Sequence, residues 1–356
     1  MSRHWGRVLL VTIAGVSFWV ARGAAQAAPD TVTLRGVIVA AGLDTPVPYS
    51  IVELAPTFSQ RFTDQSGEFA FVGLARGVYR LRARQIGYRP MDTLITVGPG
   101  LPAVRLQLLH LAIRLPAITV TGRTTCVRPG RPDAEVDPGL AAVFDQVLEN
   151  AQRFTLLADS YPHRYSASRS FTMIDHARRH QVVSVDTVLR ESWTRWRYTP
   201  GRVVGPPDAS NERPMRLPTL PDFADSAFVN AHCFWLVGRD TIEGQAFIRV
   251  DFAPGPALTF ADVAGTVYLD SLSFQLEVTT IRLTRPEQVL REGASLEATS
   301  RFREVYPGIP LLERVRAVQS YGVLHQSRAA PDAPLARVEE QTLLTVGFLR
   351  PLVPDP

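Results

Sequence analysis

The sequence predicts a mainly β protein with two domains. The first is a seven-stranded antiparallel sandwich, and the second is a curved, half-barrel-like antiparallel sheet packed on one helix. Three observations support this prediction. The 356 residues are enough for two ordinary domains after a leader. Alternating apolar runs are separated by Gly, Pro and Asp turn signals every ~8–12 residues, which is typical of antiparallel β-structure. A single segment near the middle of the chain has helical periodicity.

The first 27 residues have the pattern of a secretory leader. Arg3 and Arg7 precede an apolar stretch, Val8–Ala21, which is too short to span a bilayer comfortably. The triplet "AQA" then provides a small-residue cleavage site, so we expect cleavage after Ala27, with a retained membrane anchor as the alternative. The protein is therefore expected to be exported, and to be periplasmic or associated with the outer membrane.

The charge balance excludes one class of partner. Three of the 38 basic residues lie within residues 1–27, which contain no acid, so the mature chain has 35 basic against 34 acidic residues. A nearly neutral chain has no electrostatic reason to bind nucleic acid. Beyond the leader no apolar run approaches ~18 residues, so we expect no transmembrane segment in the mature chain.

Residues 30–123 carry the strand pattern of the sandwich. Thr31–Ala40 alternates as a strand, with Gly36 at a bulge or close approach, and Gly42–Leu54 reads as a turn and a second strand. Asp64 and Gly67 bracket a tight turn, in which Asp caps its own backbone and Gly supplies a positive φ. Further strands follow this turn, and Val78–Tyr88 presents one apolar face and one row of arginines.

The same segment resembles the carboxypeptidase regulatory-like domain. The residues that match the family pattern at its spacing are Gly36-Val37, Pro46-Val47, Ser50, Val52, Leu54, Thr63-Asp64, Gly67, Phe69, Phe71, Leu74, Gly77, Tyr79, Leu81 and Gly87-Tyr88. The resemblance implies a non-catalytic, transthyretin-like β-sandwich that is also grouped with carbohydrate-binding-like folds. In this family the signature residues build turns and core, so Asp64 is expected to be a turn residue rather than a metal ligand.

Two activities associated with such domains are not expected here. A zinc carboxypeptidase needs His-x-x-Glu, and no His of this chain has Glu three positions later. The sandwich followed by a segment such as Leu115–Arg123 also resembles the N-terminal extension of TonB-dependent transporters. Only 233 residues follow Arg123, too few for a plug and a 22-stranded barrel at about 10 residues per strand.

Residues 124–137 are rich in Pro, Gly and charge and read as a linker to a second domain at 138–350. A helix is predicted to begin there, because Asp137 can cap it and Pro138 suits its first position. The residues at helical spacing on its apolar face are Leu140, Val143, Phe144, Val147, Leu148 and Ala151. We expect this face to pack on a sheet.

The rest of the second domain is predicted to be strands. The segments that alternate are 164–175, 181–199, 246–254, 265–284, 298–322 and 336–349. Gly205–Asp222 is predicted to be a long loop, and a short helix within 222–236 would bring Cys233 towards the linker. Cys126 and Cys233 are predicted to form a disulfide after export, with two separately buried thiols as the alternative.

One stretch of the second domain, Gly244–Leu283, is similar to periplasmic lipoprotein-carrier half-barrels, with Asp270 as the aspartate that ends a strand. That resemblance implies an apolar ligand between helix and sheet, whereas a simple filled core is the alternative.

Candidate sites are few. Trp193, Trp196 and Tyr198 lie in "SWTRWRYT", where a strand would put Trp196 and Tyr198 on one face and Trp193 on the other. They are candidate ligand-binding residues by sugar stacking or, with Arg195 and Arg197, by anion binding, and sheet core with snorkelling arginines is the alternative. His176 and His180 have the spacing of a helical metal pair but lie between two strands, which favours a polar turn.

No catalytic motif stands out, and we expect no catalytic residue, metal or cofactor. The sequence therefore favours a non-catalytic binding or interaction protein with a cell-envelope protein or glycan as partner. A carrier of lipid or another apolar ligand, and an enzyme with an unrecognised site, are the alternatives.

Overall fold

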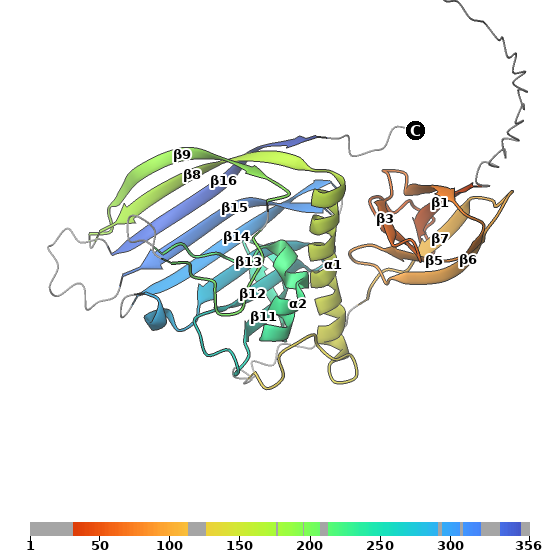
Figure 1. Cartoon of the computed structure of the whole chain (residues 1–356). Coiled ribbons are helices and arrows are strands. Elements are labelled where there is room, and N and C mark those ends of the chain that lie inside the picture. Colours follow the sequence, from red (N-terminus) through yellow and green to blue (C-terminus); the bar gives the residue numbers. More distant parts are fainter. Residues whose placement is uncertain are drawn as a thin grey trace, which may run out of the picture.

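The structure is a computed structural model that describes residues 31–112, 126–175, 177–194, 196–206, 213–290, 294–306, 309–321 and 335–349. The predicted cleavage site at Ala27, His176, Arg195 and the segment Leu115–Arg123 lie outside the described residues. A small N-terminal sandwich lies beside a long helix, and the helix packs on a large curved sheet (Figure 1).

The first domain is a sandwich of two sheets, with strand orders β4-β1-β7 and β3-β2-β5-β6. Its strands are β1 (Val32–Ala40), β2 (Ile51–Ala55), β3 (Ser59–Phe62), β4 (Glu68–Leu74), β5 (Gly77–Arg84), β6 (Met91–Val97) and β7 (Val104–Leu108). The prediction of seven strands is confirmed, but the sandwich is not wholly antiparallel, because β7 runs parallel to β1. The segment between β6 and β7 crosses from one sheet to the other, so these two strands do not form a hairpin.

The turn before β4 has the predicted chemistry. The carboxylate of Asp64 accepts hydrogen bonds from the backbone N–H groups of Ser66 and Glu68, both at 2.8 Å. Gly67 has φ +74°, in the left-handed region that favours glycine. Asp64 is therefore a turn residue.

The second domain contains a nine-stranded sheet in the order β10-β11-β12-β13-β14-β15-β16-β8-β9. Its strands are β8 (His163–Ile174), β9 (His180–Glu191), β10 (His232–Ile242), β11 (Gln245–Pro254), β12 (Val263–Asp270), β13 (Leu276–Leu283), β14 (Ser295–Tyr306), β15 (Ile309–Ser320) and β16 (Ala336–Phe348). Its helices are α1 (Pro138–Ser160) and α2 (Ser226–Ala231), with 3₁₀ turns η1 (Leu220–Ala224) and η2 (Pro286–Gln288). The predicted curved sheet packed on a helix is confirmed.

Helix α1 begins where the sequence predicts. Asp137 accepts a hydrogen bond from the Leu140 N–H at 2.8 Å, and Pro138 occupies the first turn. The predicted apolar face packs on the sheet. Val143 and Phe144 are fully buried in a cluster with aromatic side chains of α2, β10 and β11.

One prediction about the middle of the chain is wrong and another is confirmed. The strand predicted over Ser192–Thr199 is not found among the described residues there, since β9 ends at Glu191 and an irregular segment follows. The short helix predicted within 222–236 is α2, and it brings Cys233 to the linker, where it is joined to Cys126. The pattern does not predict β10, which begins at His232 directly after α2. The apolar run Cys233–Val237 has no strict alternation, because β10 is covered by α1 at its start.

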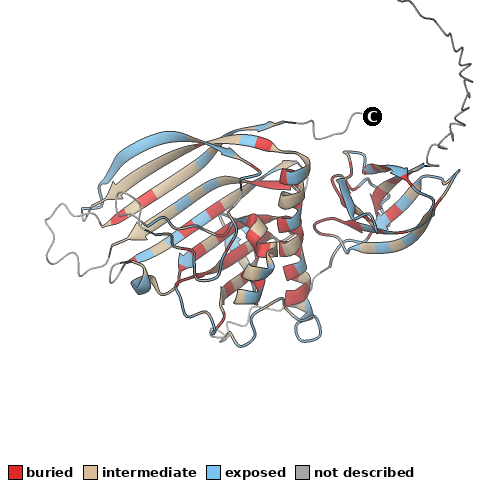
Figure 2. Ribbon diagram, viewed as in Figure 1, coloured by how far each residue is buried: buried red, intermediate tan, exposed pale blue. Residues whose placement is uncertain are grey.

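The sheet has two halves. In the covered half, β10 to β13, α1, α2 and η1 bury a continuous aromatic core. In the open half, β14 to β16 with β8 and β9, most side chains are half-buried or exposed (Figure 2). No helix within the described residues is long and apolar enough to cross a bilayer.

Candidate functional site

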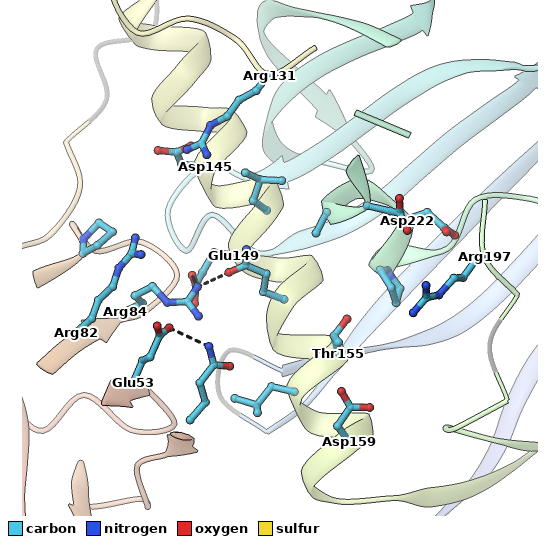
Figure 3. A pocket seen from close by; sticks show the side chains of 18 of the residues that line it. Glu53, Arg82, Arg84, Arg131, Asp145, Glu149, Thr155, Asp159, Arg197 and Asp222 are labelled. Atoms are coloured by element: carbon cyan, nitrogen blue, oxygen red, sulfur yellow. Dashed lines mark hydrogen bonds and ion pairs between the residues drawn. The ribbon is translucent and has the colours of Figure 1, made fainter. Parts of the chain in front are cut away.

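A cleft of about 920 Å³ lies between the sandwich and the second domain (Figure 3). Its floor is one face of α1, one wall is the sandwich, and the other wall comes from the segments after β9 and around η1. The lining residues are Glu53, Gln60, Arg82, Arg84, Pro90, Arg131, Asp145, Leu148, Glu149, Gln152, Thr155, Leu156, Asp159, Trp193, Trp196, Arg197, Pro221, Asp222, Ala224 and Asp225. The volume is within the range of small-molecule sites, roughly 300–1,000 Å³.

The floor follows from the helical period. Asp145, Leu148, Gln152, Thr155 and Asp159 recur every three or four residues, so they form one stripe along α1. Leu148, which was predicted to lie on the apolar face, is at the border, because it lines the cleft and also packs against the core. The other four residues of the stripe are polar and lie apart from the face that packs on the sheet. Helix α1 therefore separates a packed core on one side from a polar cleft on the other.

The sandwich wall is the arginine row of β5, whose three members have different surroundings. Arg80 is exposed and pairs with Asp92 of β6 at 2.7 Å. Arg82 lines the cleft and makes no hydrogen bond or ion pair with the described residues. Arg84 is buried and pairs with Glu149 of α1 at 2.5 Å.

A buried polar network fixes the sandwich against α1. Arg153 is fully buried and donates to two backbone oxygens of the sandwich, Tyr49 O at 2.6 Å and Arg84 O at 3.0 Å. Its Nε lies 3.1 Å from Glu149 Oε1. Burial lowers the pKa of Arg153 to about 10, although the Glu149 carboxylate opposes this change. The guanidinium still carries its charge at neutral pH.

The loop after β5 enters the second domain. The Gly87 N–H donates to Gln146 Oε1 of α1 at 2.8 Å, and Ile86 is buried in the core of the covered half. Gly87 has φ +78°, and a Cβ there would lie 3.2 Å from Ser273 O. The Gly87-Tyr88 signature of the sandwich thus forms part of the contact between the domains.

The second wall contains two of the three predicted ligand-binding residues. Trp193 is 45% exposed and lies beside Arg164, and Trp196 is half-buried beside Arg216. Both line the cleft together with Arg197.

Tyr198 does not line the cleft. It is 3% exposed, and its hydroxyl donates to Asp262 Oδ2 at 2.7 Å. Burial raises the pKa of Tyr198 above its ordinary value, and the Asp262 charge raises it further, so the hydroxyl stays protonated. Its ring meets that of Trp196 edge to face at 6.4 Å. Tyr198 therefore supports the cleft wall from inside the core.

Asp222 also supports this wall. Its carboxylate accepts from the Tyr198 N–H at 3.1 Å and from Thr219 N and Oγ1 at 2.7 and 2.8 Å. Burial raises the pKa of Asp222, while these hydrogen bonds oppose the change. Asp222 and Asp262 together fix the backbone that carries Trp196 and Arg197.

Five of the carboxylates that line the cleft accept hydrogen bonds from protein donors. The donors are Gln60 for Glu53, Arg131 for Asp145, Arg84 for Glu149, Thr219 and Tyr198 for Asp222, and the Ala227 N–H for Asp225. Within the described residues no group of three or more His, Cys, Asp or Glu side chains could hold a metal ion. His180 lies at the start of β9, and its predicted partner His176 is outside the description.

Three other predicted residues have structural roles. Asp270 ends β12, and its Oδ1 accepts from Leu272 N, Ser273 N and Ser273 Oγ at 2.7–3.0 Å. Cys126 and Cys233 form a disulfide with 5.6 Å between their Cα atoms, which is the predicted pairing.

Comparison with known protein families supports the predicted family of the first domain. Residues 33–108 match the carboxypeptidase regulatory-like domain family. The carboxypeptidase regulatory-like domain thus supplies one wall of the cleft, and its match ends before α1 begins. No curated protein matches the chain.

Two solved structures are similar over most of their own length. A DUF1329 family protein from Desulfovibrio piger is 9% identical, with 58% of this chain and 92% of that chain covered at a TM-score of 0.32. A LolA superfamily protein from Nitrosomonas europaea is 11% identical, with 60% and 94% covered at a TM-score of 0.28. At these values neither likeness indicates a function.

Sequence reasoning did not predict the cleft itself. Its residues come from β2, β3, β5, α1 and the irregular segments of the second domain, so the site exists only once the domains dock. Two signals were present: the arginine row of β5, and the polar stripe of α1 between Asp145 and Asp159.

Proposed function

We propose that this is an exported, non-catalytic binding protein that holds a glycan of the cell envelope in the cleft between its two domains. The observation that carries the proposal is the pair Trp193 and Trp196 on one wall of a cleft whose remaining lining is largely polar. Aromatic rings stack on the apolar faces of sugars, while charged and amide side chains exchange hydrogen bonds with hydroxyl groups.

Export is supported by the leader pattern in residues 1–27 and by the disulfide between Cys126 and Cys233. Such bridges persist in oxidising compartments outside the cytosol. Binding rather than acid–base catalysis is favoured because five of the carboxylates that line the cleft already accept hydrogen bonds from the protein.

An apolar carrier is the alternative, but its expected ligand site is occupied. Between α1 and the covered half of the sheet, Phe144, Phe252 and Ile281 belong to one packed cluster. Ten of the twenty residues that line the cleft on the other side of α1 are charged, which disfavours a lipid chain there.

The test is calorimetric titration of the mature protein with soluble oligosaccharides, including neutral, amino and uronic sugars and fragments of the peptidoglycan glycan strand. We expect at least one to bind, and Trp193→Ala and Trp196→Ala to raise its Kd roughly tenfold each, since ~1.5 kcal/mol of lost aromatic contact is about a factor of ten. Trp235→Ala is the matched control, because Trp235 lies on β10 away from the cleft.

Failure of every sugar to bind at millimolar concentration would overturn the glycan proposal. Co-purification of an extractable lipid would favour the carrier instead. Turnover of a glycoside or peptide substrate, lost on changing one cleft carboxylate, would overturn the non-catalytic reading.

A further inference from the structure

Strand β9 is an edge of the nine-stranded sheet, and no described strand pairs with its outer side. It is 12 residues long, contains no proline, and is exposed along nearly its whole length. Its exposed apolar residues are Val182 at 60%, Val183 at 60%, Val185 at 64% and Leu189 at 77%. A long, exposed, β-branched edge invites pairing with another strand.

The opposite edge of the same sheet is protected at one end. The linker covers the start of β10, where Cys126 is joined to Cys233 and the Gly130 N–H donates to His232 O at 2.9 Å. The two ends of the sheet therefore differ, since the linker occupies the edge at the start of β10, whereas no described strand pairs with the outer side of β9.

We propose that β9 pairs antiparallel with β9 of a second copy of this chain, about a two-fold axis at Thr187. A two-fold contact of this kind pairs the β9 edges of the two copies with each other, so the assembly stops at a dimer. Pairing of β9 with β10 of the next copy would instead leave a free edge at each end and continue into a fibre. The linker at the start of β10 argues against that second arrangement.

The register follows from the faces of β9. Opposite residues of an antiparallel pair share a face, so a two-fold contact must join residues of like orientation. The pairing with β8 puts Val185, Thr187 and Leu189 on one face, opposite Ser170, Ser168 and Ser166. A bulge between Phe171 and Thr172 interrupts the alternation before Ser184, which limits the regular part of β9 to Ser184–Glu191.

With Thr187 opposite its own copy, Val185 lies opposite Leu189 on both sides of the axis. The two most exposed apolar side chains of this stretch thus cover each other. On the other face, Asp186 lies opposite Val188 and diagonal to both Arg190 and Asp186 of the second copy, and each Asp186 is already paired with Arg169 of its own chain. An axis at Asp186 would instead put two aspartates face to face.

The first measurement is the mass of the mature protein by sedimentation velocity at tens of micromolar. We expect a dimer, and we expect Leu189→Arg to raise the dimer dissociation constant at least tenfold. Leu189 is 77% exposed, so this change should leave the fold intact. Leu94→Arg on β6, another edge strand with a 70% exposed leucine, is the matched control and should leave the dimer unchanged.

The second measurement tests whether the two-fold axis of the dimer lies at Thr187. The described chain has no free cysteine, so Thr187→Cys introduces a single reactive thiol. Mild oxidation should cross-link this variant rapidly into a dimer, while Thr96→Cys, an exposed threonine on β6, should remain monomeric on a non-reducing gel. A monomeric mass for the unmodified protein, or cross-linking of Thr187→Cys no faster than that of Thr96→Cys, would overturn the proposal.

Discussion

The covered half and the open half of the nine-stranded sheet belong to one continuous ladder but bury different amounts of surface. In the covered half, strands of 8 to 11 residues pack beneath α1, α2 and η1. In the open half, strands of 12 or 13 residues extend beyond the helix. Strand pairing alone can extend a sheet, but only the helix turns part of it into a core.

The two halves also differ in side-chain chemistry. Phe228, Phe234 and Phe252 of the covered half pack on one another with ring centroids 5.5 to 6.5 Å apart. In the open half the cross-strand contacts are often ionic or cation–π, such as Arg169 with Asp186 and Arg337 over Phe171. We expect stability to reside in the first half and surface available for partners in the second.

The largest expected difference between the two halves is in the stability lost when one phenylalanine of each half is replaced by alanine. Phe252 is 2% exposed in the covered core, so Phe252→Ala should lower the free energy of unfolding by about 3–5 kcal/mol. Phe171 is half-buried with Arg337 4.6 Å from its ring centroid, so Phe171→Ala should cost only ~1 kcal/mol. Urea denaturation of both variants measures the difference. Equal losses would show that the open half is packed as tightly as the covered half.

The next effect concerns the closed edge of the sheet. Replacing Cys126 and Cys233 together by serine removes the bridge across a sequence separation of 107 residues. We expect a loss of about 2–4 kcal/mol, below the ~4–5 kcal/mol that chain entropy alone would give. Urea denaturation of the double variant, with the oxidised parent as control, measures it. No loss of stability would mean that α1 holds β10 without the bridge.

Sequence reasoning was most successful where a few neighbouring residues decide the structure. The turn at Asp64 and Gly67, and the start of α1 at Asp137 and Pro138, depend on local hydrogen bonds and fixed dihedral angles. Such signals are visible in the chain itself. The sandwich was therefore predicted in detail, and its match to a known family confirms it.

Where contacts between residues far apart in the sequence decide the structure, the sequence pattern did not predict which side chains are buried. Arg84 belongs to a row that reads as an exposed strand face, yet it is buried because α1 supplies Glu149, which is 65 residues away. Tyr198 looked like a partner of Trp196 on a binding face, but Asp262 holds it in the core. The cleft depends on both contacts, so its shape was not predictable from either domain alone.

The smallest expected effect is a difference in pKa between two aspartates, one in each half of the sheet. Asp222 lies in η1 of the covered half, where burial raises its pKa. Asp186 is on the open edge strand, where the hydrogen bond from Arg169 lowers its pKa. NMR titration of the carboxyl carbons should therefore find the two groups on opposite sides of the ordinary value of ~3.9.

These two pKa shifts change the stability of the protein with pH in opposite directions. The contribution of Asp222 should fall as pH rises from the unfolded pKa through its raised folded pKa, because the native state holds that proton more tightly. The contribution of Asp186 should be present above the unfolded pKa and be lost as pH falls through its lowered folded pKa. Arg169→Gln should return the Asp186 pKa towards its ordinary value, while Thr219→Val, which removes a donor, should raise that of Asp222 further. Titration of both aspartates at the same pKa would mean that Asp222 is as well hydrated as Asp186 on the edge strand, and that the covered half admits water at η1.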